Sequence, residues 1–442
     1  MGRGTSRRVL VAGLALWIAS TALTPARSET SPAPSVEAPA RAAEARFDPL
    51  RATEDYLAKV PAADRARSDA YFEGGYWLQL WIFLAGLAVA WIFLRTRLSA
   101  RIRDRAEALT RSRWLQTLLY SSAYIVLSVV FSFPLSLYAD FFREHRYGLS
   151  NQTFAAWMKD QVTALGVGLI LGAAGLTALY AVFRKAPRRW WIGGAVVTIL
   201  FVFLTALIGP VYIAPLFNTY TPLSDGDLRD SILSMARANG IPARDVYQFD
   251  ASRQSKRVSA NVSGLWGTMR ISLNDNLLNR CTKEEIESVM GHEMGHYVLN
   301  HVYKGNLEFA ILIFAGFAFI RWTFEALVRK RGGAWGIRGI ADVAGLPLLG
   351  ALFSIFFFLC TPLINTAVRT AEAEADIFGL NASGHPDAEA EVALKLGEYR
   401  KLSPSPLEEW IFFDHPSGRN RILMAMRWKA EHLGQAPAAP PP

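Results

Sequence analysis

The residues best suited to chemistry in this chain are His292, Glu293 and His296, which form an H-E-x-x-H motif within the segment VMGHEMGHYV. Residues four apart on an α-helix share one face, so the two imidazoles can bind a single Zn²⁺. The glutamate beside the first histidine can then act on a water bound to the zinc. The motif predicts a zinc-dependent peptidase. The alternative is a surface helix on which two histidines occur by chance.

A catalytic zinc ion needs a third protein ligand, and the segment RTAEAEAD at residues 369–376 offers one. Glu372 and Asp376 are four residues apart and share a helical face, whereas Glu374 points away from both. We predict that Glu372 is the third ligand. Asp376 would then accept a hydrogen bond from a ligating histidine and fix its tautomer. The alternative is an exposed acidic helix start, where glutamate also suits the helix dipole.

Three further residues are candidates for the catalytic steps. Glu293 is predicted to be the general base, which later carries the proton to the leaving amine. A tetrahedral intermediate needs hydrogen-bond donors for its oxyanion, and His415 and Arg421, in the segment DHPSGRNRI, could supply them. On local evidence alone these two would be a loop histidine and a surface arginine. His301 is predicted to lie off the ligand face and to take no part.

A peptide substrate often adds to the edge of a β-sheet through main-chain hydrogen bonds. The segment SANVSG at residues 259–264 could be such an edge strand, and Asn261 within it could bind the substrate backbone. An ordinary turn explains the same segment equally well.

The apolar composition indicates a membrane protein. Of 442 residues, 51% are hydrophobic, and the mean hydropathy is +0.17. A fully buried soluble helix could explain one long apolar block, but not six blocks that each approach the roughly 20 residues of a membrane-spanning helix. These blocks are residues 76–94, 114–138, 162–183, 190–213, 307–327 and 345–364. A further apolar run at residues 9–23 is either a signal peptide or a first span.

The net charge of +9 reflects membrane orientation rather than nucleic-acid binding. The arginines and lysines concentrate in three loops between the predicted spans, at residues 95–113, 184–189 and 329–338. All three loops fall on one side of the membrane, which the positive-inside rule makes cytoplasmic. The catalytic segments are therefore predicted on the non-cytoplasmic side of a bacterial inner membrane.

The fold predicted is mainly α, with many membrane helices, a zincin-type protease domain and a small β-sheet. A helix is expected at residues 227–239 and strands at 246–249 and 269–273. Thr282 and Glu285 form a predicted capping box that starts the motif helix. The predicted segments are a signal-like segment or first span (1–27), a linker (28–75), an N-terminal membrane region (76–213), a soluble segment (214–306), two last spans (307–366), a C-terminal helical part (367–433) and a disordered tail (434–442).

From about residue 76 to residue 427, the chain resembles the integral-membrane CAAX prenyl protease type 1 family. The segments that carry the resemblance, in family order, are RYGLSNQT (146–153), PLFNTYTPL (215–223), GHEMGH (291–296), RxxExxAD (369–376) and HP followed by RI (415–416 and 421–422). Val368 and Ser417 depart from the family pattern, as do the residues before Asn261, and the last departure affects the expected substrate preference.

The resemblance implies a helical barrel around a chamber, with a gluzincin-type site holding one Zn²⁺ per chain at one end. It also implies Glu372 as third ligand, with Asn261, His415 and Arg421 as substrate or oxyanion contacts. The expected activity is C-terminal processing of prenylated peptides at the bilayer, with no nucleic acid and no required oligomer. The alternatives are a quality-control zinc protease for membrane proteins and, in another class, a non-catalytic channel or holdase.

Overall fold

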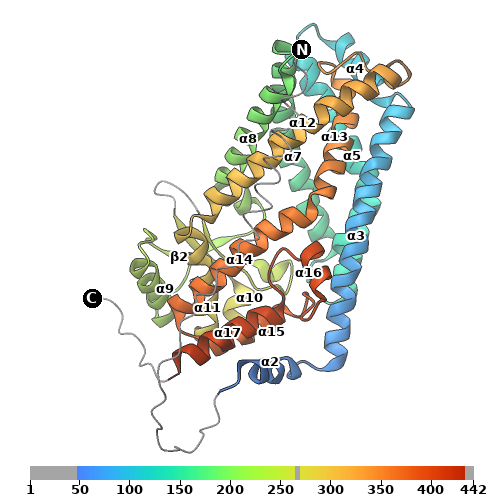
Figure 1. Cartoon of the computed structure of the whole chain (residues 1–442). Coiled ribbons are helices and arrows are strands. Elements are labelled where there is room, and N and C mark those ends of the chain that lie inside the picture. Colours follow the sequence, from blue (N-terminus) through green and yellow to red (C-terminus); the bar gives the residue numbers. More distant parts are fainter. Residues whose placement is uncertain (1–46, 264–268, 434–442) are drawn as a thin grey trace, which may run out of the picture. The chain divides into compact units, whose positions relative to one another are not determined.

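The computed structural model describes residues 47–263 and 269–433, and the predictions for residues 9–23 and 434–442 lie outside them. The described part is mainly helical, as predicted (Figure 1). Its longer helices are α2 (Pro49–Ala58), α3 (Ala62–Arg95), α4 (Leu98–Leu109), α5 (Arg113–Ser136), α7 (Phe154–Lys185), α8 (Trp190–Ile208), α9 (Asp227–Ala238), α11 (Lys283–Val298), α12 (His301–Trp335), α13 (Leu346–Leu359), α14 (Thr361–Ser383), α15 (Pro386–Leu396) and α17 (Gly418–His432). Shorter ones are α6 (Arg143–Arg146), α10 (Asp275–Arg280) and α16 (Pro406–Phe412).

The chain is a multi-pass membrane protein. Among the described residues, five helices are long and apolar enough to cross a bilayer: Ala62–Arg95, Arg113–Arg146, Phe154–Lys185, Trp190–Leu216 and His301–Trp335. They contain five of the six predicted blocks. The sixth block is not one straight helix, because α13 and α14 meet at Cys360 with a bend of 57°. Pro362, at the start of α14, has no backbone N–H to continue the hydrogen bonds of α13.

The expected linker is helical from Pro49 onward, which corrects the predicted boundary at residue 75. Asp48 caps α2 by accepting a hydrogen bond from the backbone N–H of Leu50, and α3 begins soon after, at Ala62. The buried side chain of Leu57 packs in one core with Ile422 of α17. Helix α2 therefore belongs to the folded part that carries the C-terminal helices.

A small mixed sheet lies between the membrane helices α8 and α12 in the sequence. Its order is β1 (Tyr220–Pro222), β2 (Val246–Phe249), β4 (Arg270–Asn274), β3 (Ala260–Ser263). Strands β2 and β4 are parallel and the other neighbours antiparallel. Strands β2 and β4 lie at the predicted places. Strand β3 is the predicted edge strand, and it carries Asn261.

The sheet supports the motif helix through a shared apolar core. Ile271 and Leu273 of β4 are fully buried against Met290 and Met294 of α11. Helix α9, confirmed near its predicted bounds, closes the same core with Ile232. Burying side chains of this size stabilises the fold by about 1.5–3 kcal/mol each. The position of α11 is therefore fixed by the sheet on one side, while α14 packs on another.

Candidate active site

Local sequence signals begin and end the motif helix. Thr282 and Glu285 form the predicted capping box, in which each side chain bonds to the backbone N–H of the other. The helix stops at Val298, and Asn300 takes a left-handed conformation with φ 58°. Between these ends, His292 and His296 lie one turn apart, on the side of α11 that meets α14.

Helices α11 and α14 approach closely because glycines line their crossing. A Cβ atom on Gly379 of α14 would lie 2.8 Å from the backbone nitrogen of His292, and one on Gly291 would lie 3.0 Å from the carbonyl oxygen of Gly379. A Cβ on Gly295 would lie 3.2 Å from the Cα atom of Ala375. Backbone therefore packs on backbone at this crossing.

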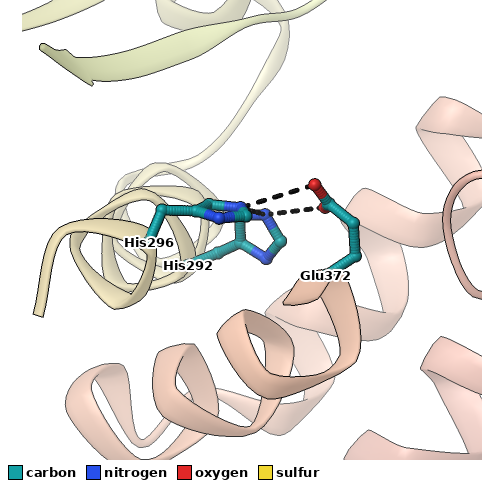
Figure 2. A group of neighbouring side chains, drawn as sticks. All are labelled: His292, His296 and Glu372. Carbon is teal, nitrogen blue, oxygen red and sulfur yellow. Dashed lines mark hydrogen bonds and ion pairs between the residues drawn. The ribbon is translucent and has the colours of Figure 1, made fainter. Parts of the chain in front are cut away.

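This crossing brings the three predicted ligands together (Figure 2). Glu372 points from α14 toward both histidines, with its Oε2 3.3 Å from Nε2 of His292 and its Oε1 3.5 Å from Nε2 of His296. The two Nε2 atoms are 3.1 Å apart. One ligand atom from each residue lies within 4.8 Å of the others, so the set could hold a metal ion.

Hydrogen bonds on the far side of each ring suit both histidines to metal binding. Nδ1 of His292 lies 2.7 Å from Oδ1 of Asp376, which is buried, and a carboxylate can only accept. Nδ1 of His292 therefore carries the proton, and Nε2 offers a lone pair. Asp376 occupies the place that the sequence predicted for it.

His296 is held by two residues that sequence analysis dismissed. Nδ1 of His301 lies 3.0 Å from Nδ1 of His296, and Nε2 of His301 lies 3.0 Å from a carboxylate oxygen of Glu374. Since the carboxylate must accept, His301 donates to it and accepts from His296, which leaves Nε2 of His296 free for a metal. The prediction that His301 takes no part was wrong, because it assumed that α11 continues past Asn300.

The charges around the site favour a cation between the ligands. Burial lowers the pKa of His292, but hydrogen bonds with Asp376 and Glu372 outweigh this effect and raise that pKa to about 10. These two carboxylates thus stabilise a positive charge at the position where a bound metal would supply one. Glu293 is half-buried in a cavity that His292 and Glu372 also line, and burial raises its pKa.

The structure holds Arg421 behind the ligands, at the wall of the cavity that Glu293 and His415 also line, and its expected role at the oxyanion stays a prediction. Its Nη2 lies 2.5 Å from Oδ1 of Asp376 and 3.2 Å from Oε1 of Glu389. All three side chains are buried, and Ser288 donates to the other oxygen of Glu389. The guanidinium thus neutralises two buried carboxylates and holds Asp376 against His292. We regard Arg421 as a positioning residue.

His415 remains beside the ligands. Its Nε2 lies 3.2 Å from Oε2 of Glu372, and its Nδ1 lies 2.8 Å from a carboxylate oxygen of Asp414. Both ring nitrogens therefore face acceptors, so the ring is placed to donate. A cavity of about 220 Å³ is lined by His415, Glu293 and the residues before Asn261 on the edge strand.

Comparisons with known proteins match this architecture. The model for peptidase family M48 matches residues 222–429, and the model for the CAAX prenyl protease N-terminal region, described as five membrane helices, matches residues 52–219. An uncharacterized metalloprotease of Bacillus subtilis, YhfN, is 31% identical over 78% of this chain and 82% of its own length. The chain belongs to peptidase family M48. It is therefore a membrane metalloprotease, and the family implies a metal cofactor.

Two further proteins are similar to this M48 peptidase, one in sequence and one in fold. A CAAX prenyl protease 1 homolog of Arabidopsis thaliana is 30% identical over 72% of this chain and 76% of its own length. The crystal structure of S. mikatae Ste24p superposes with a TM-score of 0.71 at 23% identity, covering 86% of this chain and 95% of that one. This likeness shows that the two proteins share a fold.

The glycine crossing predicts the effect of Gly379→Ala. The new methyl group meets the backbone of α11, which cannot rotate away, so the helices must separate and carry Glu372 away from the histidines. We expect a loss of about 1–3 kcal/mol in stability and weaker metal retention, measured by thermal unfolding and by metal analysis after dialysis. Gly333→Ala is the control, since a Cβ there meets nothing within 4 Å. Full metal retention in Gly379→Ala would contradict the role of this crossing.

The placement of Arg421 predicts that Arg421→Gln acts on stability. Removal of the guanidinium leaves Asp376 and Glu389 buried without their cation, at a cost of about 3–5 kcal/mol. Thermal unfolding of the purified protein measures this loss. Arg419→Gln, on the same helix, is the control, because Arg419 pairs with Glu54 at the surface and should change the Tm little. If Arg421→Gln and Arg419→Gln had the same Tm, the buried network around Arg421 would not stabilise the fold.

Proposed function

We propose that this M48 peptidase is a zinc endopeptidase that removes C-terminal residues from prenylated peptides at the membrane. The observation that carries the proposal is the ligand set: two imidazole Nε2 atoms with fixed tautomers, opposite one glutamate, with Glu293 beside them. Two histidines and one glutamate are a common ligand set for catalytic zinc, which leaves a coordination position open. His292, His296 and Glu372 would hold the ion.

Each neighbouring residue has a task in peptide hydrolysis. Zinc, when bound, lowers the pKa of water and polarises the scissile carbonyl. Glu293 would take the proton from the attacking water and deliver it to the leaving amine, and burial, which raises its pKa, suits it to do both. His415, in its doubly protonated form, would donate a hydrogen bond to the oxyanion from Nε2, while Nδ1 donates to Asp414.

A second cavity supports a substrate that comes from the membrane. It has a volume of about 690 Å³ and is lined by Phe203 and Leu207 of α8, Tyr303 of α12, Val262 of the edge strand and His296 itself. Apolar membrane helices and a metal ligand thus share one space. A prenyl chain is apolar, so it suits the apolar walls of this cavity.

Low burial of the membrane helices supports the chamber that the family resemblance implies. Along the most apolar 18 residues of each helix, no more than 28% of residues are buried, and along that stretch of Trp190–Leu216 none are. Helices around a solid centre would bury their inner faces. A ring of helices around a hollow leaves both faces accessible, one to lipid and one to a substrate chain.

We propose a bacterial inner-membrane location with the active site on the non-cytoplasmic side. Arginines from all three basic loops line one cavity: Arg103 and Arg113, Arg184, and Arg338. In Figure 1, α4 of this basic end lies at the opposite end of the helices from α11, α15 and α17. The positive-inside rule then places the basic end in the cytoplasm and the catalytic helices outside it.

The proposed chemistry predicts the behaviour of Glu293→Gln. This variant keeps the size of the side chain but cannot accept the proton, so cleavage of a farnesylated CAAX peptide should fall at least about 100-fold. Peptide cleavage by the purified protein, followed by mass spectrometry, measures it. A chelator should abolish wild-type cleavage, and added Zn²⁺ should restore it.

Two other outcomes would change the proposal. Cleavage of unfolded peptides alone, with the farnesylated peptide left intact, would favour the quality-control protease. Undiminished turnover in Glu293→Gln, with metal retained, would refute the assignment of the general base.

The orientation predicts where fused reporters work. Alkaline phosphatase fused after Trp428, in α17, should be active, because this enzyme folds only outside the cytoplasm. The same enzyme inserted at Arg111, between α4 and α5, should be inactive. The reverse pattern would place the active site in the cytoplasm.

A further inference from the structure

The cavity at the proposed catalytic site contains an arginine that the proposed mechanism does not use. Arg400 lines the same space as Glu293, Glu372 and His415. Among the described residues, its half-buried guanidinium has no hydrogen-bond or ion-pair partner. Burial lowers the pKa of Arg400, since its charge is partly removed from water. A cation in this position favours an anionic ligand.

The other cations around this cavity already have partners. Arg421 is held by Asp376 and Glu389. Lys401, the next residue along the chain, pairs with Glu73 and Glu408. Arg400 is thus the free positive charge of the described cavity wall. The same wall also carries five apolar residues, Val258, Ala260, Leu277, Val392 and Leu396, beside its polar ones.

The backbone around Arg400 is fixed, so binding has to order the side chain of Arg400 but not the turn that carries it. Ser68 of α3 donates a hydrogen bond to the carbonyl oxygen of Arg400 at 3.2 Å. Leu402 is buried, and its carbonyl oxygen accepts from the backbone N–H of Arg419 at 2.9 Å. Close packing at Gly397, where a Cβ would lie 2.8 Å from Leu402, fixes the preceding turn.

The edge strand sets the direction of a bound peptide relative to Arg400. The membrane-lined cavity meets β3 at Val262 and Ser263, and the cavity with Arg400 meets the chain at residues 258–260, before and at the start of β3. A peptide along β3 therefore has one end in each. This step rests on the proposed function: a prenylated cysteine lies N-terminal to the scissile bond and occupies the membrane-lined cavity. The C-terminal residues then enter the cavity with Arg400.

We propose that Arg400 binds the free C-terminal carboxylate of the substrate and thereby directs cleavage to the end of the chain. A guanidinium recognises a carboxylate through two parallel N–H···O bonds. Each substrate chain has one terminal carboxylate. Binding it at Arg400 would therefore set how far from the chain end the scissile bond lies. The apolar residues of this wall would contact the side chains of the residues removed.

The test compares two farnesylated peptides that differ only in a C-terminal acid or amide. Full-length wild-type protein should prefer the acid in kcat/KM by about 10- to 100-fold, the range expected for a charged hydrogen bond. Arg400→Gln should lose this preference by slowing the acid alone. Lys401→Gln is the matched control and should keep it, because Lys401 pairs away from the cavity. An equal acid-to-amide ratio in wild type and Arg400→Gln would overturn the proposal.

Two further arms separate this inference from the proposed function. If only unprenylated peptides are cut, the prenyl specificity fails, and the acid and amide forms of such a peptide still test Arg400. Binding of both forms to Glu293→Gln, with and without Arg400→Gln, measures the contact without turnover, and metal content and Tm confirm that each variant folds. An amidated peptide ending in glutamate that matched the acid would show that Arg400 binds any carboxylate, which would overturn the assignment to the chain end.

Discussion

The close packing of α11 on α14 is the contact on which the site depends. Gly291, Gly295 and Gly379 let the two backbones meet, so that Glu372 reaches both motif histidines from a helix that starts more than sixty residues later. Interiors this tightly packed transmit displacement instead of absorbing it. A larger side chain at this crossing would therefore displace the metal ligands. The sheet on the other side of α11 prevents the helix from yielding.

Buried polar chains surround that contact and orient the ligands. Asp376 fixes the ring of His292 and is itself held by Arg421, while His301 and Glu374 do the same for His296. Such groups are costly to bury unless each finds a partner, so they specify one arrangement. The first network ends at Arg421 of α17 and the second at Glu374 of α14. The geometry of the metal ligands therefore depends on the tertiary fold.

The same site joins two environments. The cavity beside His296 is lined by membrane helices, and the cavity beside Glu293 is lined by β3 and the turn that carries Arg400. Under the proposed function, a peptide anchored in the bilayer would reach the proposed zinc site through the cavity beside His296. Orientation, chamber and chain-end recognition are parts of one proposal for how a lipid-linked substrate is cut near its end.

The sequence by itself determined the features that depend on short spacings: the histidine pair, the capping box at Thr282, five membrane helices and the strands β2, β3 and β4. Periodicity and caps act within a few residues, so they can be recognised in one chain. Tertiary structure decided what depends on distant partners or on a break in a helix. The turn at Asn300 brings His301 to His296, the bend at Cys360 divides the sixth apolar block, and the packing of the C-terminal helices buries Arg421 against Asp376.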